Sequence, residues 1–306
     1  MKATYMLYNL FQKKKLQHNV RLYKKLGLGK SYFSPVSSKD FRNIDTSLLA
    51  PEKHISPLES TSLYKELNEQ SQASLRNYAS EGFAILHQYL KSDTVDAINA
   101  EIEQLINDKK VAFRYRNKIM FAIHKSPLLK EIGTDPALLE LLSSLMKDEV
   151  TLFQSINFLT GSEQRTHSDS IHMTTFPLGG LLGVWIALED IDTDNGPLHY
   201  YPGSHTLPYY LNSDYDNEGN WLLIGDKDYK EYERMLDRKV KEHNIQKRIF
   251  TARKGDLLIW HANLLHGGEP HTNKQKTRKS MVYHYFASNS ICYHEITQRP
   301  ALIFAD

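Results

Sequence analysis

Near the middle of the 306-residue chain stands the stretch Gln164-Arg165-Thr166-His167-Ser168-Asp169. It places a histidine two residues before a carboxylate. Alternate residues of a strand share one face, so His167 and Asp169 can point into the same site if the stretch lies at a strand edge. The pair alone is weak evidence, because about one His-x-Asp pair is expected by chance in a chain of this composition. A strand-end histidine bonded to a nearby carboxylate is the simpler alternative, so the surrounding sequence has to decide.

The sequence around this stretch, from about residue 149 onward, consists of short β-rich segments separated by turns. Glycine and proline mark the turns, as in Pro177-Leu178-Gly179-Gly180 and Asp194-Asn195-Gly196-Pro197. Many short strands punctuated in this way are typical of a sandwich, a barrel or a jelly roll. A charged helical insertion near residues 226–244 interrupts them. We expect strands at residues 150–159, 171–175, 181–188, 198–201, 247–250, 256–261 and 281–287.

The preceding part of the chain has helical patterns. Apolar residues recur at helical spacing from Ser92 to Asn107, and Ser92-Asp93 can cap this helix. We also expect helices at residues 60–78 and 136–147, and a short strand at 83–86. Helices first and strands afterwards indicate an α+β chain with a mainly β core that N-terminal helices flank. We therefore expect one domain over residues 61–306.

Residues 1–60 form a basic accessory segment in front of this domain. No Asp or Glu occurs before Asp40, whereas Lys and Arg are frequent. A short amphipathic helix is expected at residues 16–26, and a loop-like stretch punctuated by proline follows it. We interpret the segment as a basic surface arm, with an organelle transit peptide as the alternative.

Composition limits the classes of function. The chain has 38 Lys and Arg against 36 Asp and Glu, and the resulting net charge of +2 argues against a protein devoted to nucleic acid. The single cysteine, Cys292, excludes an intramolecular disulfide and a cysteine-based zinc site, and it favours a reducing, cytoplasmic setting. No apolar run reaches the length of a membrane span. Oligomeric state is not predicted by the sequence.

A histidine downstream can complete a metal site with the first pair. His266 ends the strand that begins at Asp256, and Gly267-Gly268 follows it. Two imidazoles and one carboxylate, with no thiol, suit Fe(II) and leave three coordination positions open. His261 is the other candidate histidine in this strand, and we interpret it as a neighbour of the site rather than a ligand.

Arg278 can add an anion site beside the metal. It begins a strand, and Ser280, two residues further on, shares its face. A guanidinium binds a carboxylate through two parallel hydrogen bonds, and a hydroxyl can add a third. The pair can therefore hold the far carboxylate of a dicarboxylic acid whose other end binds the metal. For Arg278 alone, a solvated charge at a strand edge is the alternative.

Taken together, these features resemble the phytanoyl-CoA dioxygenase family over about residues 76–288. The resemblance implies a double-stranded β-helix, or jelly-roll, core and an Fe(II)/2-oxoglutarate-dependent oxygenase. It rests on five segments in this order: His167-Ser168-Asp169, Gly183-Val184-Trp185-Ile186-Ala187-Leu188-Glu189-Asp190, Asn195-Gly196-Pro197-Leu198-His199-Tyr200-Tyr201-Pro202-Gly203-Ser204-His205, His266-Gly267-Gly268 and Arg278.

The resemblance also assigns roles to residues. The implied iron ligands are His167, Asp169 and His266. The implied 2-oxoglutarate-binding residues are Arg278, Ser280, Trp185, Gln154, Asn157 and Lys118. Candidates for the substrate pocket, from their places near these segments, are His172, Met173 and Tyr201.

The reaction that the resemblance implies uses Fe(2+), 2-oxoglutarate and O2. It hydroxylates a C–H bond of a small organic substrate and releases succinate and CO2. Relatives that halogenate carry a small residue at the position of Asp169, so the carboxylate favours hydroxylation here. Two alternatives are a jelly-roll metal enzyme that does not use 2-oxoglutarate, such as an isomerase or hydrolase, and a binding module on a retired scaffold.

Overall fold

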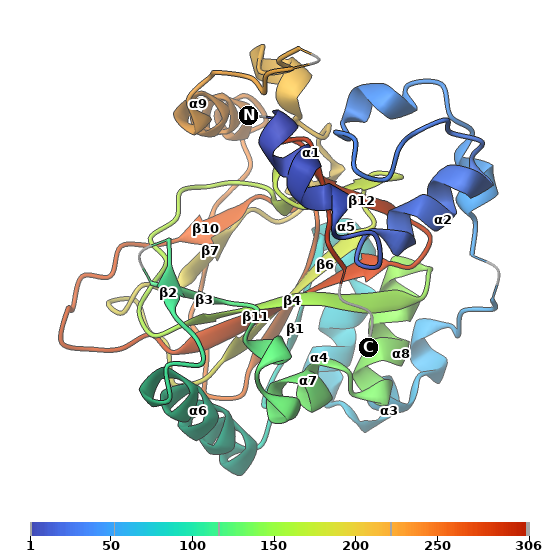
Figure 1. The fold of residues 1–306 in the computed structure, drawn as a ribbon. Helices are drawn as coiled ribbons and strands as arrows, with labels where there is room; N and C mark the ends of the chain where they lie inside the picture. The colour runs from blue at the N-terminus through green and yellow to red at the C-terminus, as the bar shows by residue number, and fades with distance from the viewer. Residues whose placement is uncertain (1, 52, 116, 221, 304–306) are drawn as a thin grey trace.

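A seven-stranded antiparallel sheet forms the centre of the computed structural model, which describes residues 2–51, 53–115, 117–220 and 222–303 (Figure 1). Its strand order is β1-β9-β6-β11-β4-β3-β2, so neighbours in the sheet come from distant parts of the sequence. The strands are β1 (Phe83–Leu86), β2 (Phe113–Arg114), β3 (Lys118–Met120), β4 (Val150–Phe158), β6 (Leu181–Ala187), β9 (Leu257–His261) and β11 (Ser280–Ala287).

A three-stranded sheet faces the large one and makes the core a jelly roll. Its order is β10-β7-β8, and Trp185 of the large sheet packs in one cluster with Tyr200 and Phe250 of the small sheet. A third sheet, β13-β12-β5, lies at the other end of the fold. The strands of these two sheets are β5 (Thr174–Phe176), β7 (Leu198–Tyr200), β8 (Arg248–Phe250), β10 (His266–Gly268), β12 (Ile291–His294) and β13 (Arg299–Pro300).

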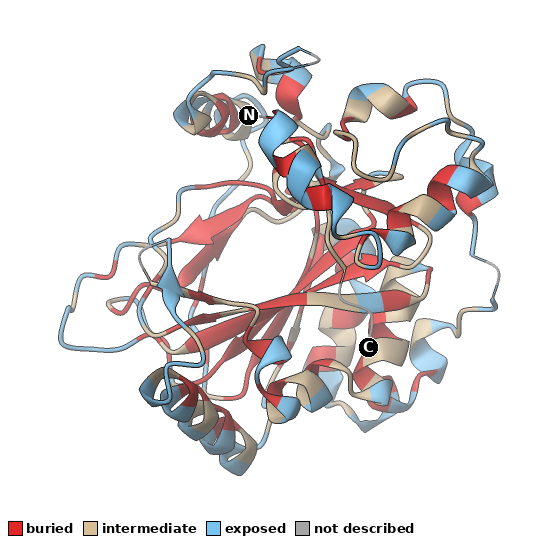
Figure 2. Cartoon of the chain, viewed as in Figure 1, coloured by how far each residue is buried: buried red, intermediate tan, exposed pale blue. Residues whose placement is uncertain are grey.

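Helices cover the outer face of the large sheet, and strands at its centre such as β6 are buried on both sides (Figure 2). Val184 and Ile186 of β6 point to the helices, whereas Trp185 between them points to the inside of the jelly roll. The inner face of the large sheet is not covered by these helices, so its side chains can contribute to a binding site inside the jelly roll. The covering helices are α3 (Ser62–Glu66), α4 (Glu69–Arg76), α5 (Tyr78–Glu81), α6 (Ser92–Asn107), α7 (Pro127–Gly133) and α8 (Pro136–Met146).

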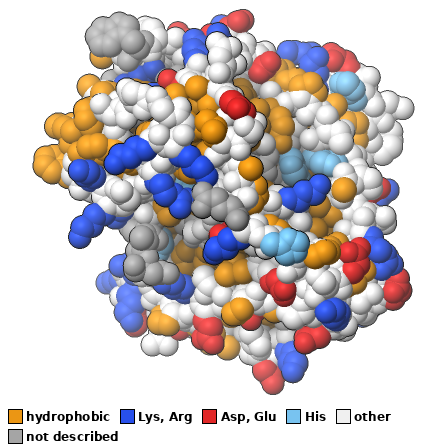
Figure 3. Space-filling model, turned by 90° about the vertical axis from the view of Figure 1, so that its right-hand side faces the viewer, with side chains coloured by type: hydrophobic (Ala, Val, Ile, Leu, Met, Phe, Trp, Pro, Cys, Tyr) orange, Lys and Arg blue, Asp and Glu red, His pale blue; other side chains and the backbone are white. Residues whose placement is uncertain are grey.

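The N-terminal segment packs against β12 rather than extending as an arm. Leu22 and Tyr23 of α2 (Gln17–Lys25) are buried with Tyr293, and the Asn19 side chain bonds both the N–H and the carbonyl of Cys292, at 2.9 and 2.7 Å. The expectation of a surface arm is wrong here, because its partner lies at the far end of the sequence. Only one face of α1 (Lys2–Leu10) is exposed. On the side of the molecule that lies to the right in Figure 1, hydrophobic and basic side chains lie next to each other (Figure 3).

Most expected strands are confirmed, with two corrections. The expected strand from Asp256 to His266 ends at His261, because the chain turns there and His266 begins β10 in the other sheet. The expected strand at 171–175 is shortened by a 3-10 turn at Asp169–Ile171 and begins at Thr174.

The helical expectations also need adjustment. The helix expected at 60–78 is three short helices, because Leu67 is extended and the Asn68 side chain caps the next helix by accepting from the Ser71 N–H. The helical insertion is confirmed as α9 (Tyr229–Glu242), which buries Leu236. None of the helices in the described residues is long and apolar enough to cross a membrane.

Leu22→Ala tests whether the N-terminal segment belongs to the folded unit. Leu22 is fully buried, so the substitution should lower the free energy of unfolding by about 2–5 kcal/mol in urea titrations. Leu7→Ala is the matched control, because Leu7 is 62% exposed and its loss should leave stability nearly unchanged. Equal effects of the two substitutions would contradict this packing.

Candidate metal centre

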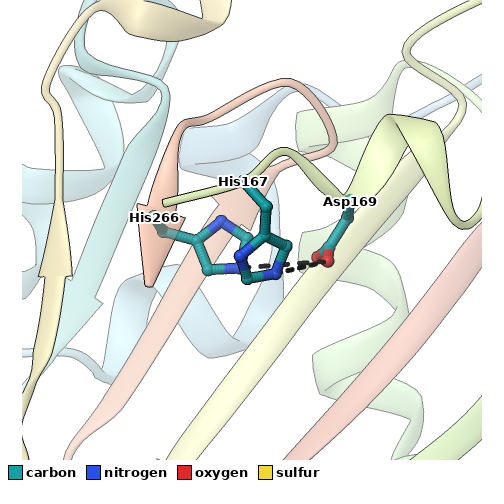
Figure 4. Close-up of side chains that lie close together, drawn as sticks. All are labelled: His167, Asp169 and His266. Carbon is teal, nitrogen blue, oxygen red and sulfur yellow. Dashed lines mark ion pairs between the residues drawn. The ribbon is translucent and has the colours of Figure 1, made fainter. Parts of the chain in front are cut away.

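Two backbone hydrogen bonds bring His167 and His266 together. Each N–H donates to the carbonyl of the other residue, at 2.9 Å in both directions, which forms an isolated antiparallel bridge. The pair exists because the chain turns after His261 and enters the small sheet at His266. The two side chains then lie on one side of the bridge, with ring centres 4.5 Å apart (Figure 4).

Asp169 completes a group of three ligand atoms. Its Oδ1 lies 3.8 Å from Nε2 of His167 and 3.8 Å from Nε2 of His266, which is too long for a hydrogen bond. All three residues are buried, and the three atoms lie within 4.8 Å of one another. Two imidazoles and one carboxylate on one side of an ion are the arrangement that suits iron(II) and leaves positions for other ligands.

The backbone orients both histidines toward this point. Nδ1 of His167 lies 2.9 Å from the carbonyl of Arg165, and Nδ1 of His266 lies 2.9 Å from that of Leu264. A carbonyl only accepts, so each Nδ1 carries the proton and each Nε2 is left with a lone pair for a metal. This network assigns the same tautomer to the two rings, which is the one a shared ion requires.

The second oxygen of Asp169 is held by two residues that the sequence reasoning missed. Trp260 Nε1 donates to Oδ2 at 2.8 Å, and His284 Nε2 lies 3.4 Å from the same atom. Nδ1 of His284 in turn accepts from the Gln154 side chain at 3.2 Å. These contacts turn Oδ1 toward the histidines. Strand alternation was the available signal, because Trp260 and His284 share faces with Leu258 and Val282.

The protonation states suit metal binding. Burial lowers the pKa of His167 well below 6.5, and the nearby His266 lowers it further, so the ring is neutral. Burial raises the pKa of Asp169, but His266, His284 and His167 together outweigh it and the net shift is downward. The centre therefore offers two lone pairs and one negative charge.

Arg278 is a buried cation close to these strands. Its Nε donates to the carbonyl of Gly196 at 3.0 Å, another nitrogen donates to the Ser280 hydroxyl, and the guanidinium lies 5.4 Å from the Trp185 ring centre. Burial lowers its pKa to about 10, so it stays protonated. Among the described residues no carboxylate is in ion-pair contact with it. A buried charge without a partner is unfavourable, so the arrangement fits a bound anion.

A cavity of about 610 Å³ joins the three ligands and the arginine. Lys118 lines it and donates to Gln164 at 2.9 Å, and burial lowers the pKa of this lysine. The predicted residues that line the cavity are His167, Asp169, His266, Arg278, Trp185, Gln154, Lys118, His172 and Met173. Ser280 reaches the site through its bond to Arg278.

Two predicted site residues lie elsewhere. Asn157 is paired with Met281 and Ile119, on the helix-covered face of β4, because it stands three residues from Gln154 and strand faces alternate. Tyr201 packs with Leu211 and Tyr232 in a separate cluster. Neither lines the cavity, so the structure does not support the roles expected for them. His261 also lies outside the ligand group, as expected.

Comparison with known proteins places this site in a family. The family model described as phytanoyl-CoA dioxygenase matches residues 78–280. Phytanoyl-CoA dioxygenase domain-containing protein 1 from Danio rerio is 36% identical over 96 residues, 29% of this chain and 32% of that protein. The matched stretch therefore spans about a third of that relative's length.

Solved structures share the fold at low identity. The non-heme alpha ketoglutarate dependent carbocyclase SnoK from nogalamycin biosynthesis superposes with a TM-score of 0.62 at 17% identity, over 83% of this chain and 97% of that one. EctD from S. alaskensis with 2-oxoglutarate and 5-hydroxyectoine gives a TM-score of 0.56 at 19% identity, over 78% and 82%.

The core is a jelly roll, and the metal centre consists of two histidines and one carboxylate. These two features define a class of non-haem metal proteins to which this chain is similar. The family match extends over most of the sequence. The chain belongs to the phytanoyl-CoA dioxygenase family.

Trp260→Phe tests the support of Asp169. Loss of the 2.8 Å bond should weaken the binding of Fe(II) or Co(II) roughly 10–100-fold, measured by anaerobic calorimetry without any cosubstrate. Trp185→Phe is the control, since Trp185 lies beside Arg278 and its indole nitrogen has no partner among the described residues. Unchanged metal affinity in Trp260→Phe would show that the indole does not orient the ligand.

Proposed function

We propose that the protein is an Fe(II)/2-oxoglutarate-dependent oxygenase that hydroxylates a C–H bond of a small organic substrate and releases succinate and CO2. One observation carries the proposal. The cavity that contains the three metal ligands also contains Arg278, a buried guanidinium without a carboxylate partner in the described chain. A dicarboxylic 2-oxo acid fits both features, because one end can bind a metal and the other an arginine.

The chain's own residues would divide the work between the two ends of 2-oxoglutarate. Arg278 would bind the far carboxylate, and the Ser280 hydroxyl, which already contacts the guanidinium, would hold the arginine in place. The Trp185 and Phe158 rings lie 5.4 and 5.7 Å from the guanidinium carbon and keep water from it. Lys118 lies 5.8 Å from the same Phe158 ring and would add positive charge to this end of the cavity.

His167, Asp169 and His266 would hold iron(II), which, when bound, supplies activation of O2 at the expense of 2-oxoglutarate. Trp260 and His284 would keep Asp169 in its orientation, and Gln154 would keep His284 in its tautomer by donating to Nδ1. Hydrogen bonds would thus fix the orientation of Asp169, while apolar side chains such as Met173 and Phe286 line the remaining wall of the cavity.

The kind of oxidation is part of the proposal. Of the two structurally similar proteins, one is named a carbocyclase and the other was solved with 2-oxoglutarate and 5-hydroxyectoine, so the fold alone does not specify the reaction. We propose hydroxylation because Asp169 keeps its carboxylate and leaves no ligand position to a halide. A metal enzyme that needs no oxo acid is the competing function, and it predicts that Arg278 is dispensable. We propose a cytoplasmic small-molecule enzyme, in line with its single, buried cysteine.

Arg278→Gln separates these functions. Removal of a buried charge partner should raise the KM for 2-oxoglutarate about 100-fold, measured as succinate release with Fe(II) and ascorbate. Arg248→Gln is the control, because Arg248 is an exposed arginine on β8 outside the cavity. If both variants turn over 2-oxoglutarate like the parent, or if the parent never does, the proposed function is wrong.

A further inference from the structure

The cavity continues past the metal centre to a wall from the end of the chain. Tyr293, His294, Thr297 and Arg299 line it there. These residues lie beyond residue 280, where the family match ends. This wall and the iron ligands therefore belong to one cavity, but the wall is outside the part of the sequence that defines the family.

We call the part of the cavity between the metal centre and this C-terminal wall the chamber. The side of the chamber that strands β4 and β11 form is aromatic. Phe153 of β4 packs against Phe286 of β11 with ring centres 4.6 Å apart, and against Phe121 at 6.2 Å. Met173 packs in the same group as Phe153 and Phe286. A β-bulge in β4 near Phe153 lets that ring and Gln154 both reach the cavity. Such a surface binds an apolar or aromatic body.

The C-terminal wall offers hydrogen-bond donors. His294 Nδ1 accepts from the Thr297 N–H at 3.3 Å, and burial lowers the pKa of His294 to about 4, so the neutral ring carries its proton on Nε2. The Thr297 hydroxyl oxygen is buried and has no partner among the described residues. Arg299 stands exposed at the rim, and no carboxylate of the described chain is in ion-pair contact with it. The wall therefore carries a neutral N–H donor and an exposed cation, and both residues line the cavity.

The N-terminal segment braces this wall from outside. The Tyr5 ring centre lies 5.1 Å from the Arg299 guanidinium, and the Tyr5 hydroxyl donates to the carbonyl of Gln298 at 3.2 Å. Lys2 donates to the Gln298 side chain at 2.6 Å. Gln298 is held in the left-handed region, with φ of 55°, so the turn that presents Arg299 depends on these contacts.

We propose that this chamber is the substrate subsite and that it takes an apolar or aromatic molecule with one anionic group. The body lies on Phe121, Phe153 and Phe286, and the carboxylate, sulfonate or phosphate is bound by Arg299. His294 adds its N–H. Tyr5 is a positioning residue, because it acts through Arg299. That the bound molecule is the substrate rests on the proposed function. That such a molecule binds in the chamber does not depend on the proposed function.

A pair of fluorescent probes tests the proposal at equilibrium. 8-Anilinonaphthalene-1-sulfonate and N-phenyl-1-naphthylamine share an aromatic body, and only the first carries an anion. The protein of residues 1–306 should bind the sulfonate about tenfold more tightly. Arg299→Gln should remove most of that preference, and Arg248→Gln should retain it. Tyr5→Leu should reduce the preference for the sulfonate and leave the affinity for the neutral probe unchanged.

Competition distinguishes the sources of such a ligand. Displacement of the sulfonate by dodecanoate supports a chain-like acid, and displacement by 3-phenylpropanoate supports an aromatic acid. Equal binding of the two probes, an unchanged preference in Arg299→Gln, or displacement by neither acid would overturn the proposal. The titrations need neither iron nor turnover. An inactive protein that still prefers the sulfonate would therefore contradict the proposed function alone, and an active one without the preference would contradict this inference alone.

Discussion

The reciprocal hydrogen bonds between His167 and His266 are the contact on which the site depends. They join the segment that follows β4 to the first residue of β10, and so they connect the large and small sheets at the metal centre. Because these bonds involve backbone atoms, both imidazole side chains remain available as metal ligands. The carbonyls two residues earlier, of Arg165 and Leu264, then complete the orientation of the two rings.

Around this contact, the jelly roll buries charged groups, and the burial of each charge without a partner would be energetically unfavourable. Asp169 is stabilised by surrounding histidines and by Trp260, whereas Arg278 and Lys118 have only neutral partners among the described residues. This cavity therefore contains two largely buried positive charges that lack a negative partner among the described residues. A bound dianion would relieve it. The same logic extends to the C-terminal wall, where donors again outnumber acceptors around an open volume.

The sequence predicted the residues of the site better than their connections. His167, Asp169, His266 and Arg278 could be found from their chemistry and their order along the chain, although Asp169 lies in a 3-10 turn and His266 begins a strand instead of ending one. Trp260 and His284 were missed, because alternation assigns a strand residue to a face but does not identify it as the partner of a carboxylate on another segment. For Asn157, period-two alternation alone places it opposite Gln154, and the family resemblance was a poorer guide than strand geometry.

Long-range packing set the other limit on prediction. The N-terminal segment looks like a basic arm because its charged residues dominate, but Asn19 and Leu22 find their partners on β12 near the other end of the chain. Local periodicity predicted α2 and α9, yet it could not show that α1 supports the turn before Arg299. Contacts of this separation are decided by the tertiary fold.

Anaerobic addition of 2-oxoglutarate to the Fe(II)-loaded protein tests the central claim most directly. A metal that His167, Asp169 and His266 hold, with positions left open for the 2-oxo acid, should produce a weak visible charge-transfer band on chelation. The band should be absent from a folded His167→Ala variant. A folded parent protein without the band, or a band that survives in His167→Ala, would contradict the account.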